Sequence, residues 1–324
     1  MKKILLSLSM LAFVGVVAVG ATTAFFTDTE TSTGNTFTAG SIDLKIDSTA
    51  HYNGMICQAD DASDTRYSWQ YEGQAPADPD PFQYPAAGTP CDNSWTETDL
   101  GGQKFFEYED LKPGDWGENT ISLHVYDNDA WGRFSLVNVV DDENGCTEPE
   151  LEEEQGCTND DNGELDDAMI SEVWLDQGAV PGFQNIDANG NPISENDSNY
   201  DRTEGDNIWQ KNTEPAVDIT AKPVYGEGDD ANTIIGSSYD LWEVLSSAYS
   251  QYGCSDTSSA DGHNNYGRCQ GLAEDGRMVG STTYYFGLGW ALPGDAGNEV
   301  QSDKLVGDFN FEVVQHRNNP NKTF

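Results

Sequence analysis

A repeated alternation of apolar and polar residues is the feature that most constrains the fold of this chain. In residues 42–46, Ile42, Leu44 and Ile46 alternate with charged residues, as in a strand that buries one face. The same period recurs in residues 121–125, 134–139, 284–290 and 309–313, and weaker versions lie near 104–108, 168–175 and 216–225. Such strands, separated by long polar segments, predict an all-β protein built as an antiparallel β-sandwich or jelly-roll.

One segment has a helical period instead. Leu241, Trp242, Leu245 and Ala248 share one face at a spacing of three to four residues. We expect a single helix over residues 237–252, packed on the sandwich, with Ser237 or Ser238 as its N-cap.

The long polar segments between the strands hold all six cysteines. These segments are residues 50–100, 141–167, 177–214 and 253–276. An even number of cysteines in an exported chain predicts disulfides, and six cysteines allow 15 connectivities. Pairing neighbours along the chain gives Cys57–Cys91, Cys146–Cys157 and Cys254–Cys269, so that each bond staples one polar loop. Thiolate metal ligands are the alternative, but the sequence contains no CxxC pair.

The first residues have the three parts of a secretory signal. Lys2 and Lys3 precede an apolar run over residues 4–20, and small residues follow at 21–24. We expect residues 1–24 to be a signal peptide that signal peptidase removes after Ala24, which leaves an extracellular protein without a stable membrane anchor. An uncleaved membrane anchor is the alternative.

The charge of the chain restricts its partners. Asp and Glu number 57 against 15 Lys and Arg, a net charge of −42. A surface this acidic repels phosphate groups, so nucleic acids and anionic membranes are not expected as partners. Divalent cations and high salt would both reduce the self-repulsion, and composition does not choose between them.

Motifs for catalysis are absent from the sequence. It has no HExxH, no GxSxG, no Walker loop and no GxGxxG after a strand, and its four histidines are scattered. We therefore expect no enzymatic activity and no required cofactor.

An acidic, Gly-rich stretch over residues 174–210 provides oxygen ligands of the kind that calcium prefers. Asp176, Asp206 and Asn207 are the expected ligands of one structural calcium ion, although the EF-hand spacing is missing. A solvated acidic loop is the alternative. The acidic stretches 141–145 and 159–167 are similar in composition.

Residues 24–47, AFFTDTETSTGNTFTAGSIDLKID, contain the most specific motif of the chain. They resemble the mature N-terminus of the TasA and camelysin family, in which an aromatic residue, an Asp and a Thr-rich run precede F-x-x-G-x-[IL]-D-L. The matching positions are Phe25, Phe26, Asp28, Phe37, Gly40, Ile42, Asp43 and Leu44. Residues 111–131, with LKPGD, and residues 282–314 are also similar to segments of that family.

This resemblance implies a jelly-roll subunit that polymerises with copies of itself into extracellular fibres of a cell surface or biofilm matrix. Residues 25–36 would act as a donor strand that completes the sheet of a neighbouring subunit, with Phe25, Phe26, Asp28 and Phe37 as assembly residues, and residues 37–324 would form one sandwich domain. Alternatively, residues 25–36 form the first strand of their own sandwich or stay frayed.

Two other functions remain open at this point. The chain is a secreted accessory or binding module that anchors or caps another fibre, or, less favoured, a secreted metalloprotease of the kind described for camelysins. The second of these lacks a zinc ligand set in the sequence.

Overall fold

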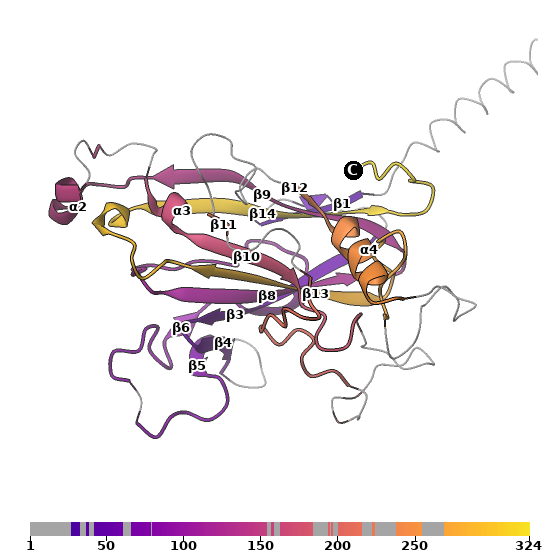
Figure 1. Cartoon of the computed structure of the whole chain (residues 1–324), viewed down its shortest axis with the longest axis horizontal. Helices are drawn as coiled ribbons and strands as arrows, with labels where there is room; N and C mark the ends of the chain where they lie inside the picture. The colour runs from indigo at the N-terminus through magenta and orange to yellow at the C-terminus, as the bar shows by residue number, and fades with distance from the viewer. Residues whose placement is uncertain are drawn as a thin grey trace, which may run out of the picture.

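The computed structural model describes residues 27–32, 37–38, 42–60, 66–78, 80–153, 157–158, 163–183, 194, 196, 200–215, 222–223, 238–254 and 269–324. Two antiparallel sheets, one above the other, form the framework of these residues (Figure 1). The predicted signal peptide and Phe25 and Phe26 lie outside the described residues.

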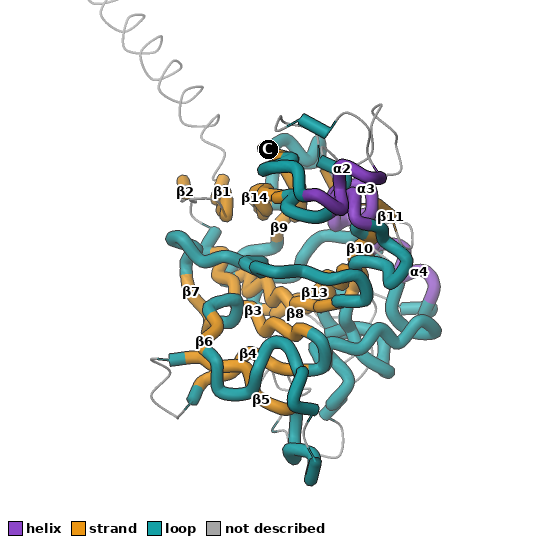
Figure 2. The backbone as a smooth tube through the Cα atoms, turned by 90° about the vertical axis from the view of Figure 1, so that its left-hand side faces the viewer, coloured by secondary structure: helices purple, strands orange, loops and turns teal. Residues whose placement is uncertain are grey.

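The smaller sheet has five strands in the order β12-β9-β14-β1-β2. Its members are β1 (Thr27–Ser32), β2 (Phe37–Thr38), β9 (Ala130–Asp142), β12 (Ser238–Asp240) and β14 (Lys304–Gln315). β9 and β14 are the long strands of this sheet, and β1 and β2 lie beyond β14 at its edge (Figure 2).

The larger sheet has nine strands, in the order β11-β10-β13-β8-β3-β4-β5-β6, and β7 pairs with β3 beside this path. Its members are β3 (Leu44–Tyr52), β4 (Met55–Ala59), β5 (Tyr67–Tyr71), β6 (Pro90–Cys91), β7 (Trp95–Thr98), β8 (Trp116–Val125), β10 (Ile170–Leu175), β11 (Lys222–Pro223) and β13 (Thr282–Ala291).

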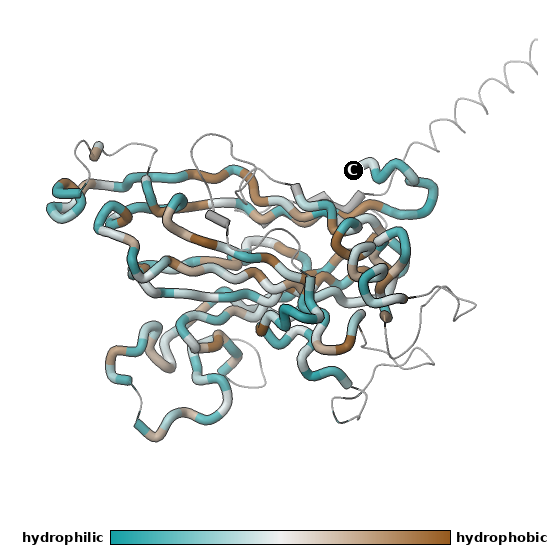
Figure 3. Tube along the Cα trace, viewed as in Figure 1, coloured by the Kyte–Doolittle hydropathy of each residue, from teal (hydrophilic) through white to brown (hydrophobic). Residues whose placement is uncertain are grey.

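The core lies between the two sheets. Alternate residues of β3 and β8, such as Leu44 and Leu123, pack in one cluster with Phe134 of β9 and Phe311 of β14. Hydrophobic positions recur along the strands, while much of the outer loops is hydrophilic (Figure 3). The chain is thus an all-β protein, as the alternating pattern predicts. The jelly-roll order of its connections stays a prediction.

The weaker strand predictions have mixed outcomes. Residues 168–175 contain β10, whereas residues 104–108 form a loop that buries Phe105 in the core. Of residues 216–225, the structure describes only β11.

The polar segment 50–100 differs from the expected loop because it carries four strands. Its apolar residues form a second core with Trp290, in which Tyr52, Met55 and Trp69 are buried. The strands of this segment pair at the end of the large sheet, so their apolar side chains are buried although the segment as a whole is polar.

The predicted helix is present but shorter. α4 spans Leu241–Gln251, and residues 238–240 form β12 instead, so the expected cap at Ser237 or Ser238 is wrong and Asp240 is the N-cap residue. Asp240 makes no capping hydrogen bond, because its carboxylate accepts one from Arg133 Nε at 2.8 Å. Pairing of β12 with β9 thus overrides helix formation in this turn. Two shorter helices, α2 (Glu148–Glu153) and α3 (Leu165–Ala168), and the 3-10 helix η1 (Asn298–Val300) complete the described elements.

All three predicted disulfides form, with S–S distances of 1.96–1.99 Å. Cys57–Cys91 joins β4 to β6, so it braces the strands of the second core rather than a free loop.

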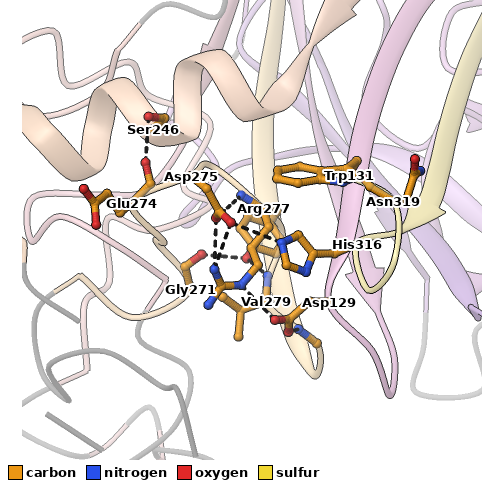
Figure 4. A network of polar contacts seen from close by, with 12 residues as sticks. Asp129, Trp131, Ser246, Gly271, Glu274, Asp275, Arg277, Val279, His316 and Asn319 are labelled. Carbon is orange, nitrogen blue, oxygen red and sulfur yellow. Dashed lines mark hydrogen bonds and ion pairs between the residues drawn. The ribbon is translucent and has the colours of Figure 1, made fainter. Parts of the chain in front are cut away.

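A network of ion pairs fastens the chain between α4 and β13 to the end of the small sheet (Figure 4). Arg277 Nε lies 2.8 Å from Asp129 Oδ2, and Arg277 Nη1 lies 3.0 Å from Asp275 Oδ1. His316 follows β14 and contacts Asp275 at 3.1 Å. Charged groups are therefore paired at this end of the molecule, in contrast to the two acidic clusters described next.

Candidate functional site

An acidic cluster lies against the outer face of the large sheet, where residues 176–183 and 200–214, called the covering segment below, lie over β8 and β3. We call it the outer-face cluster; it comprises His51, Glu118, Asp176, Asp206, Asn207 and Glu214. His51 and Glu118 are cross-strand partners in β3 and β8, and Nδ1 of the histidine lies 3.4 Å from Glu118 Oε2. Asp176 is fully buried and Glu214 is 2 % exposed, so the segment closes over its own carboxyl groups.

Asp176 and Glu214 hold the covering segment through its backbone. Asp176 accepts hydrogen bonds from the N–H groups of Gly205 at 3.0 Å and Asn207 at 3.3 Å. Glu214 accepts from Gly178 at 2.7 Å and Gln210 at 2.6 Å. These hydrogen bonds hold both ends of the covering segment against the buried carboxyl groups of Asp176 and Glu214.

Stacked indoles add an apolar clamp. Trp174 of β10 stacks on Trp209 of the covering segment, with ring centroids 5.8 Å apart. The indole of Trp174 lies against Gly287 of β13, where an added Cβ would be 2.1 Å from Trp174 Cε2. The glycine in the middle of a strand is therefore explained by the close approach of this ring.

Burial controls the protonation of the outer-face cluster. It raises the pKa values of Asp176 and Glu214, and the nearby charges of Asp206 and Asp176, respectively, raise them further. Burial also raises the pKa of Glu118 well above its ordinary value, and lowers the pKa of His51 to about 4. A negative charge on Glu118, Asp176 or Glu214 is therefore costly, so these three carboxyl groups retain protons at a pH where exposed acids are ionised.

The three expected calcium ligands come together in this cluster. Their side chains, however, take part in the hydrogen bonds of the covering segment. Asp206 Oδ1 accepts from Ile208 N at 3.0 Å, while the Asn207 amide contacts the Thr120 hydroxyl and lies 3.1 Å from His51 Nε2. A calcium ion bound by Asp176, Asp206 and Asn207 stays a prediction.

A second acidic cluster lies where β9 ends and β14 begins, at the end of the small sheet away from the Arg277 ion pairs. We call it the Asp303 cluster; it comprises Asp141, Glu143, Glu164, Asp166 and Asp303. Lys304 pairs with Asp142, so the antiparallel register brings Asp303 next to Glu143. Carboxylate oxygens of Glu143, Glu164 and Asp303 all lie within 4.8 Å of one another. Burial and then the charges of Asp166 and Asp303 raise the pKa of Asp141 to about 7.

The N-terminal sheet edge is the third feature. β1 pairs antiparallel with β14 from Thr27 opposite Val314 to Ser32 opposite Phe309, and β2 pairs with β1 on its other side. Asp28, an expected assembly residue, is the register partner of Val313, and Phe37 is the partner of Glu30. The backbone of residues 27–32 thus forms a strand on its own chain's sheet, which is the alternative that the sequence leaves open.

Several residues of these sites were not expected from the sequence. Glu118 lies three residues before the predicted strand 121–125, and a charged residue next to polar neighbours gives no local sign that β8 extends to it and buries it. Glu214 and Asp303 are single acids among many, and local sequence carries no signal for them. The stretches 141–145 and 159–167 carry only a compositional signal, their high content of Asp and Glu.

Comparisons with protein-family models, with curated proteins and with solved structures find no match for this chain. The structure therefore defines the protein by its architecture: an all-β protein of two antiparallel sheets with three disulfides. Three disulfides indicate an oxidising environment. Among the described residues, no helix has the length and apolar character needed to span a membrane.

Proposed function

We propose that the mature protein is the subunit of an extracellular fibre, at a cell surface or in a biofilm matrix, and that residues 25–36 of one copy complete the small sheet of the next. The observation that carries this proposal is the position of β1: a strand without apolar residues, near the edge of the small sheet, between the two-residue strand β2 and the long strand β14 that packs on the core. The resemblance of residues 24–47 to the TasA and camelysin family points to the same role.

The attachment of β1 depends on its backbone. Its sequence, TDTETS, has no apolar residue, so pairing with β14 provides main-chain hydrogen bonds and little burial of apolar surface. An identical strand from another copy would form the same ladder with the same register. Such a strand is exchangeable between chains.

The acceptor edge requires a partner. Phe311 and Val313 of β14 are buried in the core, which fixes this strand in place whether or not β1 is paired with it. Without β1, the N–H and C=O groups of β14 that now pair with residues 27–32 would be open to any extended chain. Strand addition at such an edge combines main-chain affinity with register set by alternate side chains.

Mixed cross-linking tests the exchange directly. Thr29 of β1 and Glu312 of β14 are register partners, and partners in an antiparallel pair have Cα atoms about 4.5–5.5 Å apart, which a disulfide spans. One preparation carries Thr29→Cys and the other Glu312→Cys. After mixing and mild oxidation, we expect a disulfide between the two introduced cysteines, joining one chain to another, identified by mass spectrometry of the digested dimer.

The matched control moves one cysteine out of register. Glu312→Cys mixed with Thr27→Cys should cross-link far less, because Thr27 pairs with Val314. Electron microscopy of the mature protein, with and without residues 25–36, then relates exchange to fibres. Monomers under all salt and calcium conditions, without any interchain cross-link, would contradict the proposal.

A second function is favoured by one exposed side chain. Phe82 is 89 % exposed on the segment that the Cys57–Cys91 disulfide closes, so its ring is available to contact a partner. In this alternative the protein is an accessory subunit that anchors or caps a fibre of another chain. It would bind that fibre without polymerising alone, and Phe82→Ser would weaken the binding.

A further inference from the structure

We propose that Trp131 and Trp242 form a binding site for alkylammonium groups, and that Lys322 of the same chain occupies and blocks it. Trp131 belongs to β9 and Trp242 to α4, so the site lies at the end of the small sheet where these two elements meet. Residues 319–324, which we call the strap, follow β14 and cover both rings. The site goes beyond the fibre proposal, because all of its groups come from one chain.

The two indoles form a corner in which one cation can lie over both rings. Their centroids are 6.1 Å apart and their planes meet at 77°. The Lys322 ammonium lies 4.7 Å from each centroid. Both distances are within the range of about 6 Å over which an aromatic face attracts a cation, and indole attracts most strongly. His316 packs against Trp131, with centroids 4.7 Å apart, and supports this wall of the corner (Figure 4).

Aromatic rings rather than carboxylates hold this ammonium. Among the described residues, no carboxylate forms an ion pair with Lys322. Lys45, Lys104 and Lys112, in contrast, each pair with an aspartate or a glutamate. In a chain with 57 acidic residues, a carboxylate is the most available partner for a lysine. The position of Lys322 therefore shows that the corner accepts a cation without a counter-charge in contact with it.

Asn319 fixes the conformation of the strap. It is 3 % exposed, and its side chain bonds the backbone of Thr323 twice: Oδ1 accepts from Thr323 N, and Nδ2 donates to Thr323 O, both at 3.0 Å. The carbonyl oxygen of Asn319 accepts the indole N–H of Trp131 at 2.8 Å. None of these bonds uses the side chain of Lys322. A substitution at residue 322 should therefore empty the corner while the strap stays folded.

The other cation near the corner is already paired. Phe324 of the strap stacks on Trp242, with centroids 6.0 Å apart, and the Arg133 guanidinium lies 4.2 Å from the Phe324 centroid. Arg133 Nε is 2.8 Å from Asp240 Oδ1, so its charge is compensated by that carboxylate. Arg133 thus leaves the corner itself to the strap lysine.

The chemistry of the corner selects its ligand. Indole faces attract positive charge and also bury apolar surface, so they favour an ammonium carried on methylene or methyl groups. An inorganic cation lacks this apolar part and is held by oxygen ligands instead. A lysine side chain and a quaternary ammonium ion both meet the requirement, and either can enter only after Lys322 has left.

Titration with tetramethylammonium chloride tests the site in the oxidised full chain. This probe has no hydrogen-bonding group, so only apolar contact and cation–π attraction can hold it. We expect Lys322→Ala to bind it about tenfold more tightly than the wild type. The NMR signal of the Trp131 indole N–H, assigned by its loss in Trp131→Phe, should shift on binding. The neutral molecule 2-methylpropan-2-ol, of similar size, should bind neither protein.

Lys211→Ala is the matched control for charge. Lys211 lies over a single indole, that of Trp209, at 4.4 Å, and its loss changes the net charge by the same amount. It should bind the probe as weakly as the wild type. Adding Trp242→Leu to Lys322→Ala should abolish the gain in affinity, and thermal unfolding shows whether this double variant folds.

The neutral molecule keeps the test decisive if the double variant does not fold, because it requires no substitution in the core. The proposal would be overturned if Lys322→Ala bound tetramethylammonium no more tightly than Lys211→Ala. It would also be overturned if Lys322→Ala bound 2-methylpropan-2-ol as tightly as the cation, since the corner would then be an apolar contact only.

Discussion

Replacing Thr29 with proline tests whether β1 is held by its backbone and whether that backbone drives assembly. Thr29 pairs with Glu312 of β14 on one side and with Thr38 of β2 on the other. Its N–H therefore points into one of the two ladders, and proline removes it. Thr29→Val is the matched control, because it retains the N–H and favours a strand.

The expected size of the effect on assembly follows from the six register pairs between β1 and β14. Six ladder hydrogen bonds at about 1 kcal/mol each contribute about 6 kcal/mol, while ordering six backbone residues costs about 6–12 kcal/mol. The net free energy of pairing β1 with β14 is thus small. The loss of one hydrogen bond makes this free energy less favourable by about 1 kcal/mol. A change of 1.4 kcal/mol is tenfold in an equilibrium constant, so a loss of about 1 kcal/mol should raise the critical concentration for polymerisation about fivefold.

The same substitution should leave the fold almost intact. A loss of about 1 kcal/mol corresponds to a decrease of about 2 °C in the unfolding midpoint of a chain this large. Phe311→Ala in the core provides the contrast, since removal of a buried Phe costs about 3–5 kcal/mol. Sedimentation velocity measures assembly, and differential scanning calorimetry measures stability. Equal critical concentrations for Thr29→Pro and Thr29→Val would refute the reasoning.

Three more outcomes are expected. Gly287→Ala should destabilise the protein by about 2–3 kcal/mol in urea unfolding, because its Cβ meets the Trp174 ring, while Gly294→Ala, which has open space, should change stability by less than about 0.5 kcal/mol. Replacing both cysteines of Cys57–Cys91, 34 residues apart, by serine should cost about 4 kcal/mol, against about 3 kcal/mol for Cys146–Cys157, 11 residues apart. The raised pKa of Glu214 means that the folded state binds a proton that the unfolded state releases near pH 4. Its contribution is thus fully present below pH 4 and is lost as the pH rises into the alkaline range; Glu214→Gln should flatten this slope in chelator-containing buffer, and an unchanged slope would contradict the assignment.

The alternation of apolar and polar residues along the sequence was sufficient to predict most of the long strands. Leu44, Leu123 and Phe311 each lie in a segment whose alternation can be recognised without knowing its neighbours, and each is buried. The disulfides also followed from the order of the cysteines, because each pair lies within one polar excursion. Pairing between distant strands, by contrast, replaced the expected helical turn at residues 238–240 with β12.

The acidic sites show where local pattern is insufficient. Asp303 lies about 160 residues from Glu143 in the sequence, and only the register of β14 on β9 brings them together. Similarly, Asn207 meets Thr120 of β8 and His51 of β3 only because residues 200–214 fold back over these strands. Among 57 acids, no spacing distinguishes those that will be buried from those that remain in water.

The sequence by itself determined the class of the fold, the strand segments, the packed helix and the pairing of the cysteines, since these depend on side-chain period and on neighbours along the chain. Only the tertiary structure decided which carboxylates leave water and which strand lies at the edge of the small sheet. Burial and register are properties of contacts between distant segments, so the free-energy cost of a buried acid exists only once the sheets have packed.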